Sequence, residues 1–372
     1  MTGPAAVRTA LIAALALVVG GCGILPGAPA PEPTPGPAAV ASLAPAPLPE
    51  RTRRPRPSAD PAATAAPEPT RRPRRLTATA EPDPVATADP TPKPTAMPPI
   101  PGLDAIAGRD GRFTLLLLGS DARRTVTGER TDAIIVATID PGTGRVAMAS
   151  LPRDTVNVPI GPGRVFASPN RINALLQAYE LDGADREEAL RRTTKAIAYA
   201  FDIEIDGYVL IGFRGLERLI EQIGGVTVVL DAPLVDPTMH LSKKGLRLKA
   251  GPNELAGNEA LAFARTRHSD SDYQRAARQQ QLIAAAGGKV VANGADALPA
   301  LAEYALTQVE TDIPLSALPV LAELGERARW RTARSIVLAP STWAGPGSVL
   351  YTIELKLDPV RRLFQRLFGP IG

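Results

Sequence analysis

Short apolar runs alternate with amphipathic segments from residue 109 to the end of the 372-residue chain. The run 113–118 (FTLLLL) is nearly all apolar, which predicts a buried strand. Further strands are expected at 133–139, 145–150, 208–213, 226–230 and 349–355, and helices at 171–179, 186–200, 215–223, 255–265 and 315–325. The segments 164–170 and 231–251 have the composition of irregular loops. This alternation predicts an α/β fold: a layered α/β/α domain with a central mixed β-sheet.

Polar residues flank the first three predicted strands on what is expected to be one edge. The first strand ends in GSDARR, with Asp121 and Arg123; the segment before the second strand holds Arg130 and Asp132; the third runs into Arg153. Pro and Gly at 141–144 predict a tight turn that pairs the second and third strands as a hairpin. Ligands usually bind beyond the carboxyl ends of strands in open α/β sheets. Together these charges predict a ligand site there, although each alone has an easy structural explanation.

The stretch 263–281 (FARTRHSDSDYQRAARQQQ) concentrates arginine around aspartate and ends in three glutamines. Serine and aspartate at 269–272 are suited to cap a helix, so a helix is expected to begin near Asp272. On that helix Asp272, Arg275 and Gln279 are separated by three and four residues, which places them on one face.

Two more arginines, Arg265 and Arg267, approach this face from the preceding segment, and Arg278 lies to one side of it. Arginine is planar, permanently charged and bidentate, and therefore suits an anion with several oxygens, such as phosphate. The alternative is a solvated helix face with ordinary ion pairs.

Several familiar chemistries are absent from the sequence. It has no G-x-S-x-G elbow and no P-loop. Its two histidines, His240 and His268, are too few for a histidine-based metal site, and its only cysteine is Cys22. The remaining candidates are acidic residues for a hard cation and arginines for phosphate.

The amino terminus predicts export. One arginine precedes an apolar run of about a dozen residues, which is short for a membrane span. The run ends in Val19-Gly20-Gly21-Cys22, which resembles the lipobox of bacterial lipoproteins. We therefore expect a lipoprotein signal peptide at 1–21 and lipidation of Cys22, so that the protein is extracytoplasmic and membrane-anchored. An ordinary signal peptide or an uncleaved anchor is the alternative; either one makes nucleic acid an unsuitable partner despite the net charge of +4.

More than half of the 39 prolines lie between Pro26 and Pro101, in a region with few large apolar residues. Such a segment cannot bury a core, so residues 22–108 are expected to form a disordered Pro/Ala/Thr-rich linker, with the folded domain at 109–372. Two basic clusters, 51–56 and 71–75, either attract anionic lipids or wall polymers or simply keep the linker solvated.

Six short motifs occur in an order that resembles the LytR–CpsA–Psr domain. They are LLLLGSDARR, GERTDA, SLPRDT, NRINAL, IGGVTV and RTRHSDSDYQRAARQQ, and they span about 113–281. Members of this family are exported, membrane-tethered bacterial enzymes. The resemblance implies transfer of a glycopolymer from a polyprenyl-pyrophosphate carrier to peptidoglycan, by a protein that faces the cell wall.

The resemblance also implies roles for individual residues. Asp121 and Asp132 would hold Mg²⁺ (or Mn²⁺), and Arg153, Arg275 and Asp272 would be catalytic, with Asp272 either orienting an arginine or acting as a base. The pyrophosphate would be bound by Arg123, Arg130, Arg153, Arg265, Arg267, Arg275 and Gln279. Thr131 and Ala133 depart from the residue types usual in the family at these positions, but neither departure removes a charge.

The implied chemistry is phosphoryl transfer, in which preorganised arginines and a cation stabilise the charge on the leaving phosphate. The lipid tail of the carrier would need an apolar slot, expected between the sheet and the helix at 215–223. Two alternatives use the same arginines: a non-catalytic polyprenyl-phosphate-binding envelope protein, and a polyprenyl pyrophosphatase.

Overall fold

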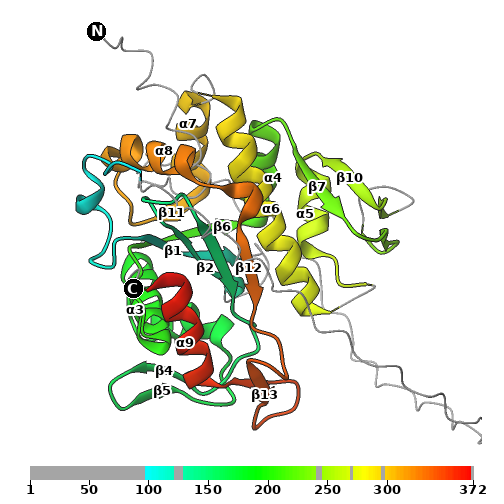
Figure 1. The fold of residues 1–372 in the computed structure, drawn as a ribbon. Helices are drawn as coiled ribbons and strands as arrows, with labels where there is room; N and C mark the ends of the chain where they lie inside the picture. The colour runs from blue at the N-terminus through cyan, green and yellow to red at the C-terminus, as the bar shows by residue number, and fades with distance from the viewer. Residues whose placement is uncertain (1–96, 121–128, 240–244, 269–270, 295–297, 370–372) are drawn as a thin grey trace, which may run out of the picture. The chain divides into compact units, whose positions relative to one another are not determined.

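A computed structural model of the chain describes residues 97–120, 129–239, 245–268, 271–294 and 298–369 (Figure 1). Within these ranges, no helix combines the length and the apolar character needed to cross a membrane.

A six-stranded mixed sheet forms the centre of the domain (Figure 1). Its strand order is β11 (Val309–Thr311), β6 (Gly207–Gly212), β1 (Phe113–Ser120), β2 (Thr131–Ile139), β3 (Val146–Ser150) and β12 (Arg334–Val337). β1 pairs in parallel with β6, and β3 with β12, while β1–β2, β2–β3 and β6–β11 are antiparallel. The predicted central mixed sheet and the predicted β2–β3 hairpin are confirmed.

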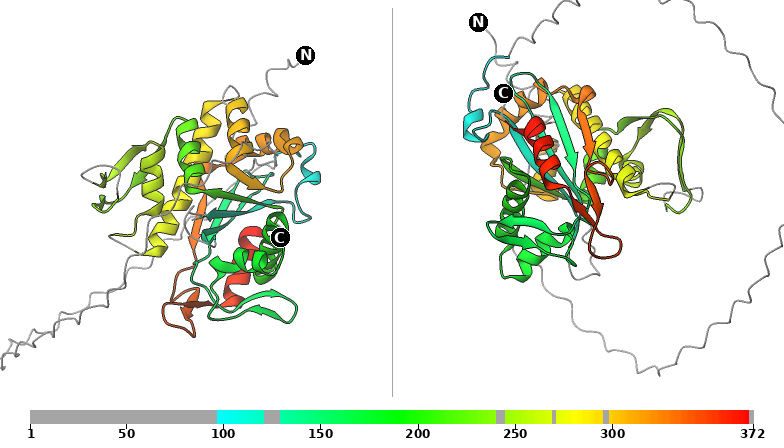
Figure 2. Two further views of the ribbon diagram at one scale, coloured as in Figure 1. Left: turned by 180° about the vertical axis from the view of Figure 1, so that it is seen from behind. Right: turned by 60° about the horizontal axis from the view of Figure 1, so that its bottom comes forward.

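Helices cover both faces of this sheet. One face is packed by α2 (Leu175–Leu181), α3 (Arg186–Phe201) and α9 (Leu357–Phe368); the other side carries α4 (Phe213–Gln222), α5 (Gly257–Arg265), α6 (Asp272–Asn293), α7 (Leu298–Gln308) and α8 (Leu318–Arg327). Figure 2 shows the same arrangement from behind and from below. The layered α/β/α class is therefore confirmed.

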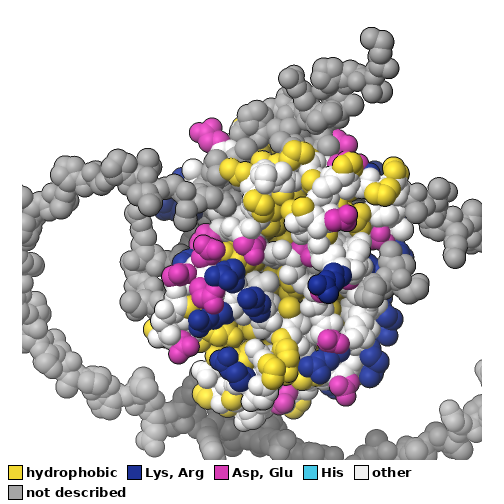
Figure 3. Space-filling view, turned by 90° about the vertical axis from the view of Figure 1, so that its left-hand side faces the viewer, with side chains coloured by type: hydrophobic (Ala, Val, Ile, Leu, Met, Phe, Trp, Pro, Cys, Tyr) yellow, Lys and Arg dark blue, Asp and Glu magenta, His cyan; other side chains and the backbone are white. Residues whose placement is uncertain are grey.

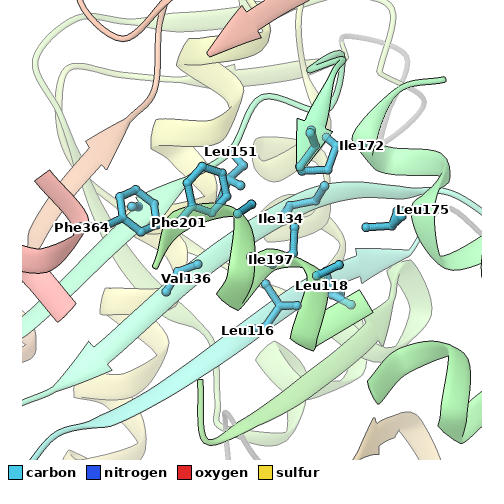
Figure 4. Packing of buried hydrophobic residues seen from close by; sticks show 14 of the residues in the cluster. Leu116, Leu118, Ile134, Val136, Leu151, Ile172, Leu175, Ile197, Phe201 and Phe364 are labelled. Atoms are coloured by element: carbon cyan, nitrogen blue, oxygen red, sulfur yellow. The ribbon is translucent and has the colours of Figure 1, made fainter. Parts of the chain in front are cut away.

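Alternation along β1 divides its side chains between the two faces, because successive strand residues point to opposite sides. Leu116 and Leu118 pack with Ile197 and Phe201 of α3 and Phe364 of α9 (Figure 4). The intervening leucines face the other side, where α8 and Trp330 lie. An apolar run buried on both faces is what the sequence 113–118 predicts.

Charged residues cover the outer surface of α3, which begins after the N-cap Asp185. Its first residue, Arg186, lies within 2.6–2.8 Å of Glu129, Glu180 and Glu310. Burial tends to lower the pKa of Arg186, but these carboxylates more than offset it and raise the pKa. Figure 3 shows basic and acidic side chains intermixed on this side of the domain.

In the described part of the chain, four short two-stranded sheets lie outside the central sheet. They are β4 (Val158–Gly161) with β5 (Arg164–Phe166), β7 (Val226–Leu230) with β10 (Gly251–Leu255), β8 (Leu234–Asp236) with β9 (Leu246–Leu248), and β13 (Ala344–Pro346) with β14 (Ile353–Leu355). The loop predictions at 164–170 and 231–251 are therefore wrong in part, because strands of three to five residues give too little alternation to be detected.

Three predicted elements also differ from the structure in their boundaries or type. The predicted strand 349–355 is confined to β14, and the predicted helix 255–265 begins at Gly257 because Leu255 ends β10. The predicted helix 171–179 begins as a short 3₁₀ helix, Ile172–Ala174, and continues into α2.

The packed domain starts earlier than the sequence suggested. Ile100 is buried in the core that contains α8. The Met97 N–H donates to the carbonyl oxygen of Gly142 over 2.8 Å, and Arg327 donates to the carbonyl oxygen of Pro98. Residues 97–108, assigned above to the linker, therefore belong to the packed domain.

Candidate active site

Three strands bring charged residues to one edge of the sheet. The register pairs Ser120, the last residue of β1, with Thr131, the first residue of β2. Asp132 thus lies beside the end of β1, and β3 ends at Ser150, just before Arg153. The structure therefore brings Asp132 and Arg153 together at the edge that the sequence predicts.

The carboxylate of Asp132 is held on both oxygens. Arg153 Nη1 donates to Oδ2 over 2.7 Å, and Asn173 Nδ2 donates to Oδ1 over 3.1 Å. The main-chain carbonyl oxygen of Asp132 accepts a further bond from Arg275 Nη2, over 3.1 Å. These contacts tie β2, the loop after β3 and α6 to one another.

α6 begins at Asp272, as predicted. Ser271 Oγ accepts from the N–H of Gln274 over 3.4 Å, and Gln274 Oε1 accepts from the N–H of Ser271 over 3.1 Å. This reciprocal capping box fixes the first turn of the helix. It therefore fixes the position of Asp272 at the sheet edge.

The carboxylate of Asp272 forms ion pairs with three arginines. Its Oδ1 lies 2.9 Å from Arg275 Nη2, 3.2 Å from Arg267 Nη1 and 3.8 Å from Arg153 Nε. Arg275 comes from the next turn of α6, Arg267 from the segment after α5, and Arg153 from the loop after β3. The site is therefore a compact cluster of three guanidinium groups and two carboxylates, with Asp132 as the second carboxylate.

Burial acts differently on the two central arginines. It tends to lower the pKa of Arg153, but Asp132, Asp272 and Asp154 outweigh burial and raise that pKa. For Arg275, whose side chain is only 8% exposed, burial dominates, and the pKa is lowered despite Asp272. Within the described ranges, the Nε atoms of both arginines are buried without a hydrogen-bond partner. Unpaired buried donors of this kind are suited to an anionic ligand.

Other predicted residues lie around this cluster. The Arg265 guanidinium stacks over the ring of Phe213, 4.4 Å from its centroid. Gln279 Nε2 donates to the carbonyl oxygen of Ala264 over 3.2 Å. Arg130 is exposed two residues before Asp132. Arg278 instead donates to main-chain carbonyl oxygens at the end of α5, which is a structural role.

Three predicted residues lie outside the described ranges. Asp121 and Arg123 fall in 121–128, and Cys22 falls in 1–96. Their predicted roles stay predictions.

A cavity of about 250 Å³ lies between the sheet and helices α4, α5 and α6. Asp132, Arg153, Arg265, Arg267, Arg275 and Gln279 line its polar part. The remaining wall is largely apolar, with Leu117, Ile135, Ile211, Leu216, Leu219, Leu282 and Ala286 among its residues. Leu216 and Leu219 belong to α4, so the cavity lies where the sequence predicts an apolar slot.

The residues of α6 that line the cavity change from polar to apolar along the helix. Its lining residues begin with Arg275 and Gln279 and continue through Leu282 and Ala286 to Gly287. At 1.5 Å per residue, Arg275 and Gly287 are about 18 Å apart along the helix. The cavity therefore has a charged end at the sheet edge and an apolar end deep beneath the helix.

A divalent cation is compatible with the described part of the site. The Asp132 side chain is 22% exposed and each of its oxygens accepts one hydrogen bond, which leaves lone pairs for a cation. No group of three or more His, Cys, Asp or Glu side chains suited to a metal occurs among the residues that the structure describes. A cation here would need further oxygens from residues 121–128, from substrate or from water, as Mg²⁺ often has.

Sequence reasoning missed the supporting polar residues. Asn173 bonds Asp132, and Arg171 Nη1 lies 2.7 Å from Oδ1 of Asp154, the residue after Arg153. Both come from the NRINAL segment, one of the six motifs, for which the family resemblance implied no side-chain role. An asparagine at the start of a predicted helix is visible in the sequence, but neither its burial nor its partner, 41 residues away in the chain, can be inferred from the sequence.

The fold and the site together define a class: an α/β/α protein with an arginine–carboxylate cluster at one end of an apolar cavity. The chain belongs to the LytR_cpsA_psr family, whose model matches residues 77–340.

Two curated relatives and one solved structure illustrate the similarity. The chain is 34% identical over 176 residues to the polyisoprenyl-teichoic acid–peptidoglycan teichoic acid transferase TagU of Halalkalibacterium halodurans, covering 46% of this chain and 51% of the relative. It is 32% identical over 260 residues to the transferase TagV of Bacillus subtilis, covering 68% and 64%. The crystal structure of B. subtilis TagV matches with a TM-score of 0.55 at 26% identity, over 71% of this chain and all of that one. The chain thus spans about half to two thirds of the length of these curated relatives.

Proposed function

We propose that the protein transfers a glycopolymer from a polyprenyl-pyrophosphate carrier to peptidoglycan. The observation that carries the proposal is the cavity with one cationic end and one apolar end. A carrier of this kind has a doubly charged pyrophosphate joined to a long hydrocarbon, and it therefore matches both ends of the cavity. The transferase names of the two relatives support the same reading.

In the proposed reaction, an acceptor hydroxyl of peptidoglycan attacks the phosphorus that bears the glycopolymer. The new P–O bond replaces the P–O bond to the second phosphate, which leaves as polyprenyl phosphate, and the hydroxyl proton passes to a base. Negative charge grows on the leaving phosphate. Arg153, Arg267 and Arg275 are positioned to stabilise that charge, because their guanidinium groups converge around Asp272.

Asp272 is assigned an orienting role. One of its oxygens lies within 3.2 Å of both Arg267 and Arg275, so it holds two phosphate-binding groups in a fixed relation. The Asp132 carboxylate likewise holds the Arg153 guanidinium in place, through the bond from Nη1 to Oδ2. Preorganised groups need no rearrangement when charge develops in the transition state. Such sites owe most of their rate enhancement to this preorganisation.

Asp132, together with Asp121, is proposed to hold Mg²⁺ or Mn²⁺. When bound, the cation would neutralise phosphate oxygens that the two carboxylates alone would repel. We further propose that Cys22 is lipidated and anchors the protein to the outer face of the membrane.

The deciding experiment incubates the full chain with a polyprenyl-pyrophosphate glycan and peptidoglycan fragments, and identifies the products by mass spectrometry. A covalent glycan–phosphate–peptidoglycan product supports the proposal. Release of free glycan phosphate even with saturating acceptor would indicate a pyrophosphatase. Tight carrier binding without any product would indicate a carrier-binding protein.

The apolar half of the cavity has its own test. Replacing Ala286 with Phe should fill part of the cavity and weaken binding of a long-chain carrier, while a pyrophosphate without the chain binds as before. Equal binding of the long-chain carrier by both proteins would contradict the assignment of the cavity to the lipid tail.

A further inference from the structure

The turn between β13 and β14 exposes three consecutive large apolar side chains. Val349, Leu350 and Tyr351 are 41%, 75% and 82% exposed. They fall within the strand predicted at 349–355, yet the structure places them in the turn before β14, exposed to solvent. A contiguous exposed apolar group with a polar rim marks an interaction site. The charged side chains of Glu354 and Lys356 provide that rim at the base of the hairpin.

This hairpin is attached directly to the loop that carries Arg153. The Ile353 N–H donates to the carbonyl oxygen of Asp154 over 3.1 Å, and the Val156 N–H donates to that of Ile353 over 2.9 Å. The β13–β14 hairpin projects from the same lower side of the domain as the β4–β5 hairpin, and α6 begins toward that side (Figures 1 and 2). The apolar tip therefore lies on the side of the molecule that holds the charged end of the cavity.

Hydrogen bonds within the hairpin pair part of the backbone at the tip. Thr352, only 5% exposed, bonds the carbonyl oxygen of Val349 through Oγ1 over 2.5 Å and through its N–H over 3.1 Å. The Gly347 N–H donates to the carbonyl oxygen of Thr352 over 2.9 Å. Internal pairing of these groups lowers the cost of moving the turn out of water into the interfacial region.

Tyr351 adopts a left-handed backbone conformation, with φ of 60°. This conformation is uncommon for a bulky residue. Burial does not explain it, since the side chain is the most exposed of the three. A strained residue that gains nothing from the core is consistent with a functional role for its direction.

We propose that this tip, Val349–Leu350–Tyr351, inserts into the interfacial region of the lipid bilayer that contains the carrier. The proposal rests on the proposed function, because a membrane-embedded carrier must reach the cavity from a bilayer. Leucine and valine would enter the acyl boundary, and tyrosine would lie at the headgroup level that its amphipathic ring favours. Insertion would hold the Arg153 loop next to the membrane surface, so that the carrier enters the site without leaving the lipid entirely.

Insertion is tested without any enzymatic readout. In the full chain with Cys22→Ala, an environment-sensitive fluorophore is attached to Leu350→Cys, or to Leu315→Cys as a control at an exposed position (47%) before α8. The protein is mixed with phosphatidylcholine vesicles that carry a nitroxide quencher at the headgroup–acyl boundary. We expect strong quenching at 350 and little at 315. Equal quenching at both positions overturns the proposal. A signal at 350 that follows protein concentration without vesicles also overturns it, because such a signal indicates contact between copies of the chain.

A second arm measures transfer by the Leu350→Ser/Tyr351→Ser double variant of the full chain. With the donor embedded in vesicles, we expect its rate to fall by about tenfold, which corresponds to ~1.4 kcal/mol. With a short-chain, water-soluble donor, its rate should equal that of the unaltered protein, and Leu315→Ser should change neither rate. If the double variant matches the unaltered protein with the vesicle-embedded donor, or loses the same factor with both donors, insertion is refuted. If the unaltered protein transfers from neither donor, the proposed function fails, and the quenching experiment still decides insertion.

Discussion

Arg275 donates through Nη2 to the main-chain carbonyl oxygen of Asp132, across 3.1 Å in space and 143 residues in sequence. The same nitrogen lies 2.9 Å from the carboxylate of Asp272. One guanidinium therefore joins the start of β2 to the first turn of α6. Because these two elements carry the two carboxylates of the site, Arg275 sets their relative position as well as supplying charge.

Replacing Arg275 with Lys should weaken carrier binding even though it keeps the charge. A single ammonium cannot reproduce the planar fork that contacts β2, Asp272 and the ligand. Loss of one charged hydrogen bond costs about 1.5–3 kcal/mol, or roughly tenfold to hundredfold in Kd. Arg278→Lys is the matched control, because Arg278 is similarly buried in α6 but bonds carbonyl oxygens of 263 and 266. The control should lower the melting temperature and spare carrier affinity; parallel losses of affinity in both variants would argue against a ligand-binding role for Arg275.

Removing the cation should separate turnover from binding. If Asp121 and Asp132 hold Mg²⁺, chelation with EDTA should abolish transfer, and excess Mg²⁺ should restore it. Asp132→Asn should also lose transfer, even in excess Mg²⁺, whereas the variant should still bind the carrier through the arginines. Transfer that continues in EDTA at an unchanged rate would remove the metal from the mechanism. Titration of carrier binding by the same samples distinguishes loss of chemistry from loss of substrate.

Local rules predicted the two halves of the site separately, Asp132 with Arg153 and Asp272 with Arg275, and only the family resemblance implied that the two halves meet. Strand ends define one edge of the sheet, and spacings of three and four define one helix face. Asn173 was not predictable in the same way. Its role depends on a contact with Asp132 that only the tertiary fold creates.

The predictions for the 349–355 segment and for the start of the folded domain were wrong in part, for opposite physical reasons. In the 349–355 segment, Leu350 and Tyr351 are exposed at a turn, so their apolar character does not mark a core. In the segment before Arg109, single apolar residues such as Ile100 stand among prolines and give no periodic pattern. Ile100 is nevertheless buried, against elements more than 200 residues later in the chain, such as α8.

A chain truncated to begin at Arg109 should therefore be less stable than one that begins at Pro94. It would lose the burial of Ile100, which alone is worth about 1.5–3 kcal/mol, and the partly buried Leu103 and Ile106. Differential scanning calorimetry of both chains measures the effect. Equal melting temperatures would show that residues 97–108 contribute nothing to the core.

A cluster of carboxylates where this segment meets β6 makes stability depend on pH. The pKa of Asp206 is raised from 3.8 to about 7, mainly because the carboxyl is buried. The hydrogen bond from the Thr114 N–H lowers this pKa, and the nearby charge of Asp110 raises it further. The folded protein thus holds this proton more tightly than the unfolded chain does. The contribution of Asp206 to the free energy of unfolding is therefore complete below the pKa of the unfolded chain, and it is lost as the pH rises through about 7.

Asp206→Asn should remove that decline, because the amide has no proton to lose in this range. Its unfolding free energy should exceed that of the unaltered protein at pH 8, by on the order of 2–4 kcal/mol, and the two should converge toward pH 4. Denaturant unfolding at several pH values measures both. The exposed Asp231→Asn variant is the control. Parallel pH profiles for the Asp206→Asn and unaltered proteins would show that Asp206 does not govern the dependence.

Two adjacent glycines in α6 should respond in opposite ways to the same substitution. A Cβ added at Gly287 would lie 2.6 Å from the ring of Trp330, whereas one added at Gly288 would lie 3.7 Å from the nearest Trp330 atom. The Trp330 ring cannot move away easily, because it is buried and its Nε1–H donates to the carbonyl oxygen of Gly325 over 3.2 Å. The absence of a side chain at Gly287 is therefore what lets the tryptophan pack against α6.

Gly287→Ala should lower the free energy of unfolding by about 1–3 kcal/mol, since overpacking outweighs the gain in helix propensity. Gly288→Ala should raise it by up to about 1 kcal/mol, because only the propensity gain remains. Chemical denaturation of both variants provides the measurement. Gly287 also lines the cavity, so its variant should bind a long-chain carrier less tightly, whereas Gly288→Ala should bind it normally. Stabilisation by both substitutions would mean that Trp330 is free to shift, and that Gly287 does not determine how the apolar end of the cavity is built.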